Sequence, residues 1–227
     1  MTDAPPAAGL VLAAGTSSRL PGGSKLLLPY AGGPLVAAPV RAALEAGLAP
    51  VLVVLGHRAR EVREALAVAL GPGEVAATGD AGGTAGAGGG RVRFVTVADP
   101  GRGQGASLAA GVAALARDPS VAAAAVLLGD EPGISPGAVR RVVSEWRPKG
   151  PALRARYRDR PGHPVVFGRG AFGVLAGLEG DRGASVLFGR DLGPVREVEL
   201  DRDAPVDVDT PGDYRRALAA AGPEAQG

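Results

Sequence analysis

The residues of this chain that could do chemistry begin in a loop of small side chains. Residues 12–25 read LAAGTSSRLPGGSK, in which Arg19 and Lys25 are the cations. Small residues let the backbone approach a phosphate closely and direct several N–H groups towards it. The two cations would neutralise the charge that accumulates on a leaving pyrophosphate. The residues expected to bind the phosphates are Leu12, Ala13, Ala14, Gly15, Arg19 and Lys25.

The spacing in this loop excludes two common phosphate-binding motifs. The loop does not contain GxxxxGK[ST], so it is not a Walker-type loop. It also lacks GxGxxG and an acidic residue at the usual distance for a ribose, which disfavours a redox enzyme that uses a nicotinamide dinucleotide. The structural alternative is a plain tight turn with two solvated cations. The position of the loop directly after the first buried strand favours phosphate binding over this alternative.

Two acidic segments are candidates for a metal site. Asp130 follows a fully apolar run and would stand at the tip of a buried strand, where it can bind Mg²⁺ that bridges phosphate oxygens. Glu131 is expected to point away or to play a supporting role. Asp207 and Asp209 share one face of an extended segment, and we favour Asp209 as the ligand because it immediately precedes a Thr-Pro pair. The structural alternatives are a turn for the first segment and a helix cap for the second.

A third segment, Arg102–Leu108, contains small residues at the start of an expected helix. These residues leave room for a ring, and a backbone group or the Ser107 hydroxyl could contact the edge of a base. Gly105 and Ser107 are therefore candidates for nucleotide binding. An ordinary helix N-terminus is the structural alternative.

The elements that must position these residues alternate between apolar runs and amphipathic segments. Buried strands are expected at 9–13, 51–55, 91–97 and 121–128, and helices at 34–46, 58–70, 105–117 and 136–146. This alternation implies right-handed crossovers and a mainly parallel sheet. Less regular strands are expected at 152–157, 164–167 and 195–200, followed by a helix at 211–221. Residues 76–90 contain GDAGGTAGAGGG, which predicts a flexible glycine-rich surface loop.

The predicted fold class is α/β, with three α/β/α layers and a mainly parallel sheet whose C-terminal portion is mixed. The 227 residues fit a single domain, residues 1–227. Within it we expect a nucleotide-binding half at about 9–150 and an acceptor-binding half at about 151–221. A switch from parallel to antiparallel pairing between them would form an acceptor pocket beside the nucleotide site.

Composition limits the possible functions and partners. The chain has 25 basic and 23 acidic residues. This balance argues against a nucleic-acid partner, because a nucleic-acid binder needs a clustered excess of Lys and Arg. It has no cysteine, which excludes disulfides, thiolate metal ligands and cysteine nucleophiles. No apolar run is long enough to span a bilayer and residues 1–8 do not resemble a signal peptide, so we expect a cytoplasmic protein without a membrane partner.

Residues 12–25 resemble the LAAGxSxRxGxxK signature of the molybdenum cofactor cytidylyltransferase branch of the MobA-like nucleotidyltransferases. Further segments resemble that family in the same order: GQGASL, GDEP, GHPVVF, GDRGA and DVDTP. Together these cover about Gly9 to about Leu218. The loop departs from the family at Leu20, where the pattern normally reads methionine, glycine after the arginine. Arg19 and Lys25 are themselves retained.

The resemblance implies a nucleotide-diphospho-sugar transferase fold and a nucleotidyl transfer that depends on Mg²⁺. It implies catalytic roles for Arg19, Lys25 and Asp130, and metal binding by Asp130 and Asp209. The residues that it places near the acceptor are His163, Asp181 and Arg182. The implied reaction transfers a nucleoside monophosphate from a nucleoside triphosphate, with CTP favoured, to a phosphorylated acceptor. Molybdopterin is the best-matched acceptor, and a molybdoenzyme is a possible protein partner.

Several alternatives remain open from the sequence. The base or acceptor could differ, as in guanylyltransferases and sugar-phosphate nucleotidyltransferases. The same branch contains proteins of nicotine-blue metabolism. The chain could also be a non-catalytic nucleotide-binding chaperone for a molybdoenzyme, although intact Lys25, Asp130 and Asp209 disfavour this. His163 could instead be a structural hydrogen-bonding residue, and His57 is expected to be structural.

Overall fold

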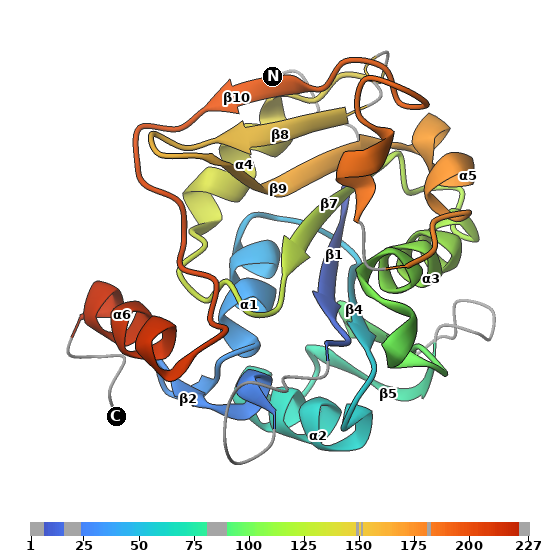
Figure 1. Ribbon diagram of the computed structural model, residues 1–227. Helices are drawn as coiled ribbons and strands as arrows, with labels where there is room; N and C mark the ends of the chain where they lie inside the picture. The colour runs from blue at the N-terminus through green and yellow to red at the C-terminus, as the bar shows by residue number, and fades with distance from the viewer. Residues whose placement is uncertain are drawn as a thin grey trace.

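An eight-stranded sheet with helices on both faces organises the described part of the chain (Figure 1). The structure is a computed structural model that describes residues 7–15, 24–80, 90–148, 150, 152–180 and 183–222. The strand order is β10-β8-β9-β7-β1-β4-β6-β5. The strands are β1 (Ala7–Ala13), β4 (Val51–Leu55), β5 (Val75–Asp80), β6 (Val92–Thr96), β7 (Ala123–Leu128), β8 (Ala152–Arg156), β9 (Pro161–Gly168) and β10 (Arg196–Glu199).

The pairing of these strands changes direction along the sheet. Strand β1 is parallel to both β4 and β7, and β6 is parallel to both β4 and β5. Strand β9 is antiparallel to β7 and β8, whereas β10 is parallel to β8. The predicted mainly parallel sheet with a mixed C-terminal portion is therefore confirmed. Because parallel strands end at the same edge, the C-terminal ends of β1, β4 and β7 lie together.

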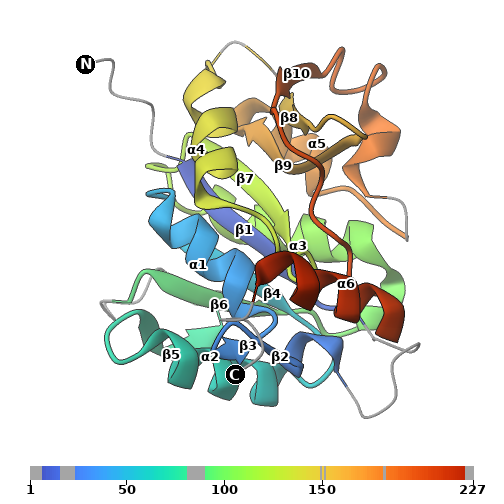
Figure 2. The same ribbon diagram turned by 90° about the vertical axis from the view of Figure 1, so that its left-hand side faces the viewer.

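Helices cover this sheet on two sides, as Figure 2 shows from a second direction. One apolar cluster joins the sheet to α1, α2 and α4, and a second joins the opposite face to α3 and α5. The helices are α1 (Ala37–Glu45), α2 (Ala59–Leu70), α3 (Gln104–Ala116), α4 (Pro136–Glu145), α5 (Phe172–Leu175) and α6 (Pro211–Ala221). No helix within the described ranges is long and apolar enough to cross a membrane.

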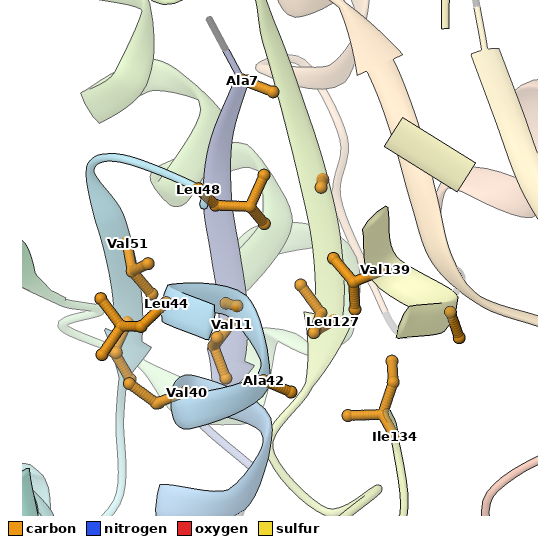
Figure 3. Close-up of a cluster of buried hydrophobic side chains, with 14 of the residues drawn as sticks. Ala7, Val11, Val40, Ala42, Leu44, Leu48, Val51, Leu127, Ile134 and Val139 are labelled. Atoms are coloured by element: carbon orange, nitrogen blue, oxygen red, sulfur yellow. The ribbon is translucent and has the colours of Figure 1, made fainter. Parts of the chain in front are cut away.

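The core fixes the central strands from both faces. Val11 of β1 and Leu127 of β7 are fully buried against Val40 of α1 and Val139 of α4 (Figure 3). Leu10, the neighbour of Val11, is equally buried but belongs to the cluster on the opposite face. Unbroken apolar runs are typical of parallel strands that are covered on both sides. This packing holds rigid the strand ends from which the candidate site projects.

A short hairpin replaces the predicted start of α1. Strand β2 (Pro29–Tyr30) pairs antiparallel with β3 (Gly33–Pro34), and helix α1 begins only at Ala37. The two residues between these strands, Ala31 and Gly32, both have positive φ, which suits a tight two-residue hairpin turn. The prediction of a helix from Pro34 was wrong because strand pairing uses this proline before the helix starts.

The predicted glycine-rich loop at residues 76–90 was wrong at its beginning. The backbone of β5 continues through Asp80 and pairs in parallel with β6, with a register shift between Val75 and Asp80. Pairing at a sheet edge uses backbone groups and does not require large apolar side chains. Residues 81–89, the rest of the predicted loop, lie outside the described residues.

Candidate active site

The candidate site begins where β1 and β7 end side by side. Leu12 lies in register with Leu128, and the N–H of Gly129 donates to the carbonyl oxygen of Leu12 over 2.8 Å. The backbone of the predicted phosphate loop therefore contacts the segment that contains Asp130. Of that loop, residues 16–23, including Arg19, lie outside the described residues.

Lys25, Asp130 and Asp209 meet at this edge of the sheet. Nζ of Lys25 donates to Oδ2 of Asp130 over 2.6 Å and to Oδ1 of Asp209 over 2.7 Å. The Lys25 side chain is only 11% exposed, whereas that of Asp209 is 48% exposed. Three residues that lie far apart in the sequence thus converge, and the site stays open to solvent on the Asp209 side.

The two carboxylates keep the Lys25 ammonium charged. Burial by itself lowers the pKa of Lys25, but the charges of Asp130 and Asp209 and the hydrogen bonds to them outweigh it and raise the pKa above its ordinary value of 10.5. The lysine is therefore a full positive charge at neutral pH. A permanent cation at this position suits the binding of phosphate groups.

The C-terminal segment carries Asp209 to this position. Helix α6 returns to the β2–β3 hairpin (Figures 1 and 2), where Tyr214 donates from its hydroxyl to the carbonyl oxygen of Pro29. Ahead of the helix, the N–H of Val208 donates to the carbonyl oxygen of Asp130 over 3.0 Å. This backbone bond places the following residue, Asp209, beside Asp130.

Thr210, and not Asp209, caps helix α6. The Thr210 hydroxyl accepts from the N–H of Asp213 over 3.2 Å, and the Asp213 carboxylate accepts from the N–H of Thr210 over 2.7 Å. This reciprocal arrangement is a capping box. The cap leaves the Asp209 carboxylate to contact Lys25.

Asp130 and Asp209 form a donor set that fits a hard divalent cation. Their oxygens converge on one position, and that position already holds a cation, the Lys25 ammonium. The described part of the chain has no group of three or more His, Cys, Asp or Glu side chains that could hold a metal ion. A cation here would take its remaining ligands from phosphate and water, which is the usual pattern for Mg²⁺. Asp207 lies apart from Lys25, and its Oδ2 is 3.0 Å from Nη2 of Arg160.

Gly105 and Ser107 use their polar groups within the protein. The N–H of Gly105 donates to the carbonyl oxygen of Gly180 over 2.9 Å, and the Ser107 hydroxyl donates to the carbonyl oxygen of Gly103 over 3.4 Å. Ser107 is 6% exposed. In this structure its hydroxyl serves the start of α3, as the structural alternative predicts. Contact between these two residues and a nucleotide stays a prediction.

A cavity lies where the sheet changes from parallel to antiparallel pairing. It has a volume of about 250 Å³ and is lined by Leu12, Gln104, Val126, Arg154, His163 and Phe188, among others. Val126 lies on β7, which pairs with β9, and His163 lies on β9 itself. The cavity therefore occupies the place where the sequence predicts an acceptor pocket. Leu12 belongs both to this cavity and to the predicted phosphate loop.

Arg154 and Phe188 are among the cavity residues that no sequence motif singled out. The Arg154 guanidinium lies 5.8 Å from the centre of the Phe188 ring, and its Nε donates to Glu197 over 2.7 Å. The Phe188 ring in turn lies 6.2 Å from that of Phe167. No sequence pattern distinguishes Phe188 from a core residue. Asp181 and Arg182, which the sequence places near the acceptor, lie outside the described residues.

His163 contacts a buried carboxylate beside this cavity. Its Nδ1 lies 3.4 Å from Oε1 and 3.3 Å from Oε2 of Glu131, a residue that is 2% exposed. Burial by itself would lower the pKa of His163, but the carboxylates of Glu131, Asp207 and Asp130 outweigh it and raise the pKa above its ordinary value of 6.5. The charged imidazolium is therefore favoured at the edge of the cavity.

Asp207 is expected to make stability depend on pH. Burial and the neighbouring Glu131 carboxylate raise the pKa of Asp207 from 3.8 to about 6. Between these two values the folded protein keeps a proton that the unfolded chain has lost, so this residue's contribution to stability falls as pH rises. Asp207→Asn should therefore become more stable relative to wild type across this range. Urea denaturation at several pH values tests this, and a constant difference in the free energy of unfolding would contradict it.

Gly56 allows the end of β4 to approach the phosphate loop. A Cβ atom at this position would lie 2.5 Å from the carbonyl oxygen of Ala14 and 2.9 Å from its Cβ. Gly56→Ala must therefore displace the Ala14 backbone. Since displacement of a binding group by about 1 Å costs roughly 10²-fold in activity, we expect kcat/KM for the nucleotide to fall by about that factor. Gly173→Ala, at a position with nothing within 4 Å of the added Cβ, is the matched control. Equal kinetics in the two variants would contradict the prediction.

Comparison with known proteins identifies the family. Residues 9–195 match the family model described as MobA-like NTP transferase domain. The chain belongs to this family. The nicotine blue oxidoreductase of Paenarthrobacter nicotinovorans is 32% identical over 226 residues, which cover 96% of this chain and 98% of that protein.

Solved structures show the same fold as this NTP transferase domain. Rv0371c of Mycobacterium tuberculosis is 35% identical with a TM-score of 0.74, covering 95% of this chain and 99% of that one. The same protein in complex with manganese gives a TM-score of 0.70 at 34% identity. A nucleotidyl transferase from Methanothermobacter is 26% identical with a TM-score of 0.71, covering 95% of this chain and 97% of that one. The predicted fold of the nucleotide-diphospho-sugar transferases is confirmed.

Proposed function

We propose that this NTP transferase domain moves a nucleoside monophosphate from a nucleoside triphosphate to a phosphorylated small molecule. The observation that carries the proposal is the contact of Lys25 with both Asp130 and Asp209. Asp130 follows Gly129, whose N–H donates to the carbonyl oxygen of Leu12, and Leu12 also lines the cavity that contains His163. A triphosphate and an acceptor would thus bind next to each other. Residues of about 9–150 would hold the nucleotide, and residues of about 151–221 the acceptor.

The chemistry requires little covalent participation by the protein. An acceptor phosphate oxygen, which is already ionised, attacks the α-phosphorus, the bond to the β-phosphate oxygen breaks and pyrophosphate leaves. Lys25, with Arg19 as a second cation, would neutralise the charge on the leaving group. Asp130 and Asp209 would hold Mg²⁺, which when bound neutralises phosphate charge. The protein otherwise contributes position, because the two reactants are held in line.

CTP and molybdopterin are the substrates that we favour. The LAAG sequence at residues 12–15 resembles the cytidylyl branch of the family more than the guanylyl branch, which usually carries a second glycine. The cavity offers the Phe188 ring and the Arg154 guanidinium, which suit a flat heterocycle with negative charge. His163, Asp181 and Arg182 would contact the acceptor phosphate. A molybdoenzyme would then receive the product.

A redox function is the second candidate, because a relative matched along 98% of its length is named nicotine blue oxidoreductase. Its name describes an oxidation or a reduction that involves nicotine blue. The sequence after β1 contains small residues suited to phosphate binding, which a dinucleotide cofactor would also use. Oxidation of NADH or NADPH in the presence of nicotine blue, without any release of pyrophosphate, would favour this function.

A nucleotide panel tests the proposed function. CTP, GTP, ATP and UTP are each incubated with Mg²⁺ or Mn²⁺ and with purified molybdopterin or a sugar phosphate, and released pyrophosphate is measured. We expect release with CTP only when molybdopterin is present. Release with GTP or with a sugar phosphate would assign a related transferase. Nucleotide binding without release under any condition would indicate a non-catalytic binder and would sink the proposal.

A further inference from the structure

Glu131 is a charged side chain that the proposed reaction does not use. It lies next to Asp130 in the sequence, yet it is 2% exposed while the Asp130 side chain is 24% exposed. Its Oε2 is buried and has no hydrogen-bond partner among the residues that the structure describes. Burial of a carboxylate is strongly unfavourable unless a partner compensates it. The buried Glu131 carboxylate therefore needs a specific polar partner.

The Glu131 carboxylate contacts the imidazole of His163, and the Asp207 carboxylate is a second neighbour. Nδ1 lies 3.4 Å from Oε1, in hydrogen-bonding range, and 3.3 Å from Oε2. The other ring nitrogen, Nε2, lies on the far edge of the ring from Nδ1. His163 lines the cavity described above, and Glu131 does not. The ring thus stands between the buried carboxylate and the cavity.

The backbone of His163 is held independently of its ring. The hydroxyl of Tyr157 donates to the carbonyl oxygen of His163, and Gly162 packs so closely that a Cβ there would lie 3.1 Å from the Tyr157 ring. These contacts fix where the side chain starts but not how the ring is turned. The contact with Glu131 can therefore set the orientation of the ring.

We infer that Glu131 is a positioning residue that accepts a hydrogen bond from Nδ1–H of His163 and so presents Nε2 to the acceptor in the cavity. The carboxylate fixes which nitrogen carries the proton, because the hydrogen bond made by one ring nitrogen determines the state of the other. In the imidazolium form, Nε2–H would donate to an anionic group. The part concerning the acceptor rests on the proposed function, whereas the orientation of the ring does not.

Nitrogen NMR tests the orientation without any substrate. The chain has two histidines, so His57→Gln, at an exposed position, leaves His163 as the single imidazole in the spectrum. We expect the neutral ring of this parent to carry its proton on Nδ1. Glu131→Ala should move the proton to Nε2, while Glu131→Gln, whose amide oxygen can still accept, should keep it on Nδ1. Asp203→Asn is the matched control, because that exposed carboxylate pairs with Arg158, and it should leave the proton on Nδ1.

Two spectra would overturn the inference. The first is a spectrum of the parent in which the neutral ring carries its proton on Nε2, and this result does not depend on whether the variants fold. The second is a spectrum of folded Glu131→Ala in which the proton stays on Nδ1. Either result leaves the proposed nucleotidyl transfer untouched. Failure of every nucleotide to release pyrophosphate would sink the proposed function and leave the spectrum as it is.

Kinetics then test the consequence for the acceptor. With CTP and molybdopterin as probes, we expect Glu131→Ala to raise the KM for molybdopterin by about 10-fold, the scale typical of a lost orienting contact. The KM for CTP should stay unchanged, and Glu131→Gln should restore most of the loss. Adding Glu131→Ala to His163→Ala should cause no further rise, since the two residues act as one unit. An equal rise of both KM values would indicate a merely structural role and overturn the inference.

Discussion

Replacement of Lys25 by alanine is expected to lower kcat for nucleotidyl transfer by about 10³-fold, the scale at which a cation that stabilises a transferring phosphate contributes. The physical reason is the geometry of the site. The ammonium is nearly buried, stays charged and lies within 2.7 Å of both carboxylates that would hold the metal. The variant loses the positive charge that would meet the leaving pyrophosphate, and it leaves two carboxylates close together. Pyrophosphate release under saturating substrates measures the effect.

The other lysine of the chain provides a matched control for this variant. The chain contains two lysines, Lys25 and Lys149, whereas its other 23 basic residues are arginines. Lys149→Ala should retain full activity. Lys25→Arg should recover little, because a planar guanidinium does not replace a compact ammonium that contacts two carboxylates at once. Circular dichroism and thermal unfolding verify that each variant is folded. Full turnover in folded Lys25→Ala would contradict the proposed role.

Asp130→Asn is expected to weaken binding of Mn²⁺ by at least about 100-fold. Loss of a residue that only supports a metal ligand typically costs about 10- to 100-fold in metal affinity, and loss of a ligand should cost more. The Asp130 carboxylate follows β7, and it contacts the Lys25 ammonium together with the Asp209 carboxylate. The amide of asparagine is neutral, so the variant keeps only one of the two carboxylates that converge here among the described residues. Calorimetry or electron paramagnetic resonance with Mn²⁺ and a non-hydrolysable nucleotide measures this binding apart from turnover.

The second carboxylate is distinguished in the same experiment. Asp209→Asn should also weaken Mn²⁺ binding, because its oxygen converges with that of Asp130. Asp207→Asn should have a much smaller effect, because that carboxylate is held by Arg160 and faces the Glu131 and His163 pair. If Asp207→Asn weakened binding more than Asp209→Asn, the assignment of the second ligand would be reversed.

Local patterns in the sequence predicted most of the elements that carry the site. The final helix was expected at 211–221 and is found at Pro211–Ala221, because a cap at Thr210 and a proline at the first position are local signals. The apolar run before Gly129 became the buried strand β7 for a similar reason. The helix expected at 34–46 is found at Ala37–Glu45, and only its start was wrong, since pairing between Pro29–Tyr30 and Gly33–Pro34 overrides the local preference.

The sequence by itself determined which residue types stand at the ends of the strands, because burial and capping depend on near neighbours in the chain. It favoured Asp209 over Asp207 without showing what either carboxylate contacts, and it provided no reason to pair Glu131 with His163 or to bring Arg154 to Phe188. Those relations join residues tens of positions apart. They are decided by strand order, by the return of α6 to the β2–β3 hairpin and by the change of strand direction at β9, and only the tertiary structure provides these.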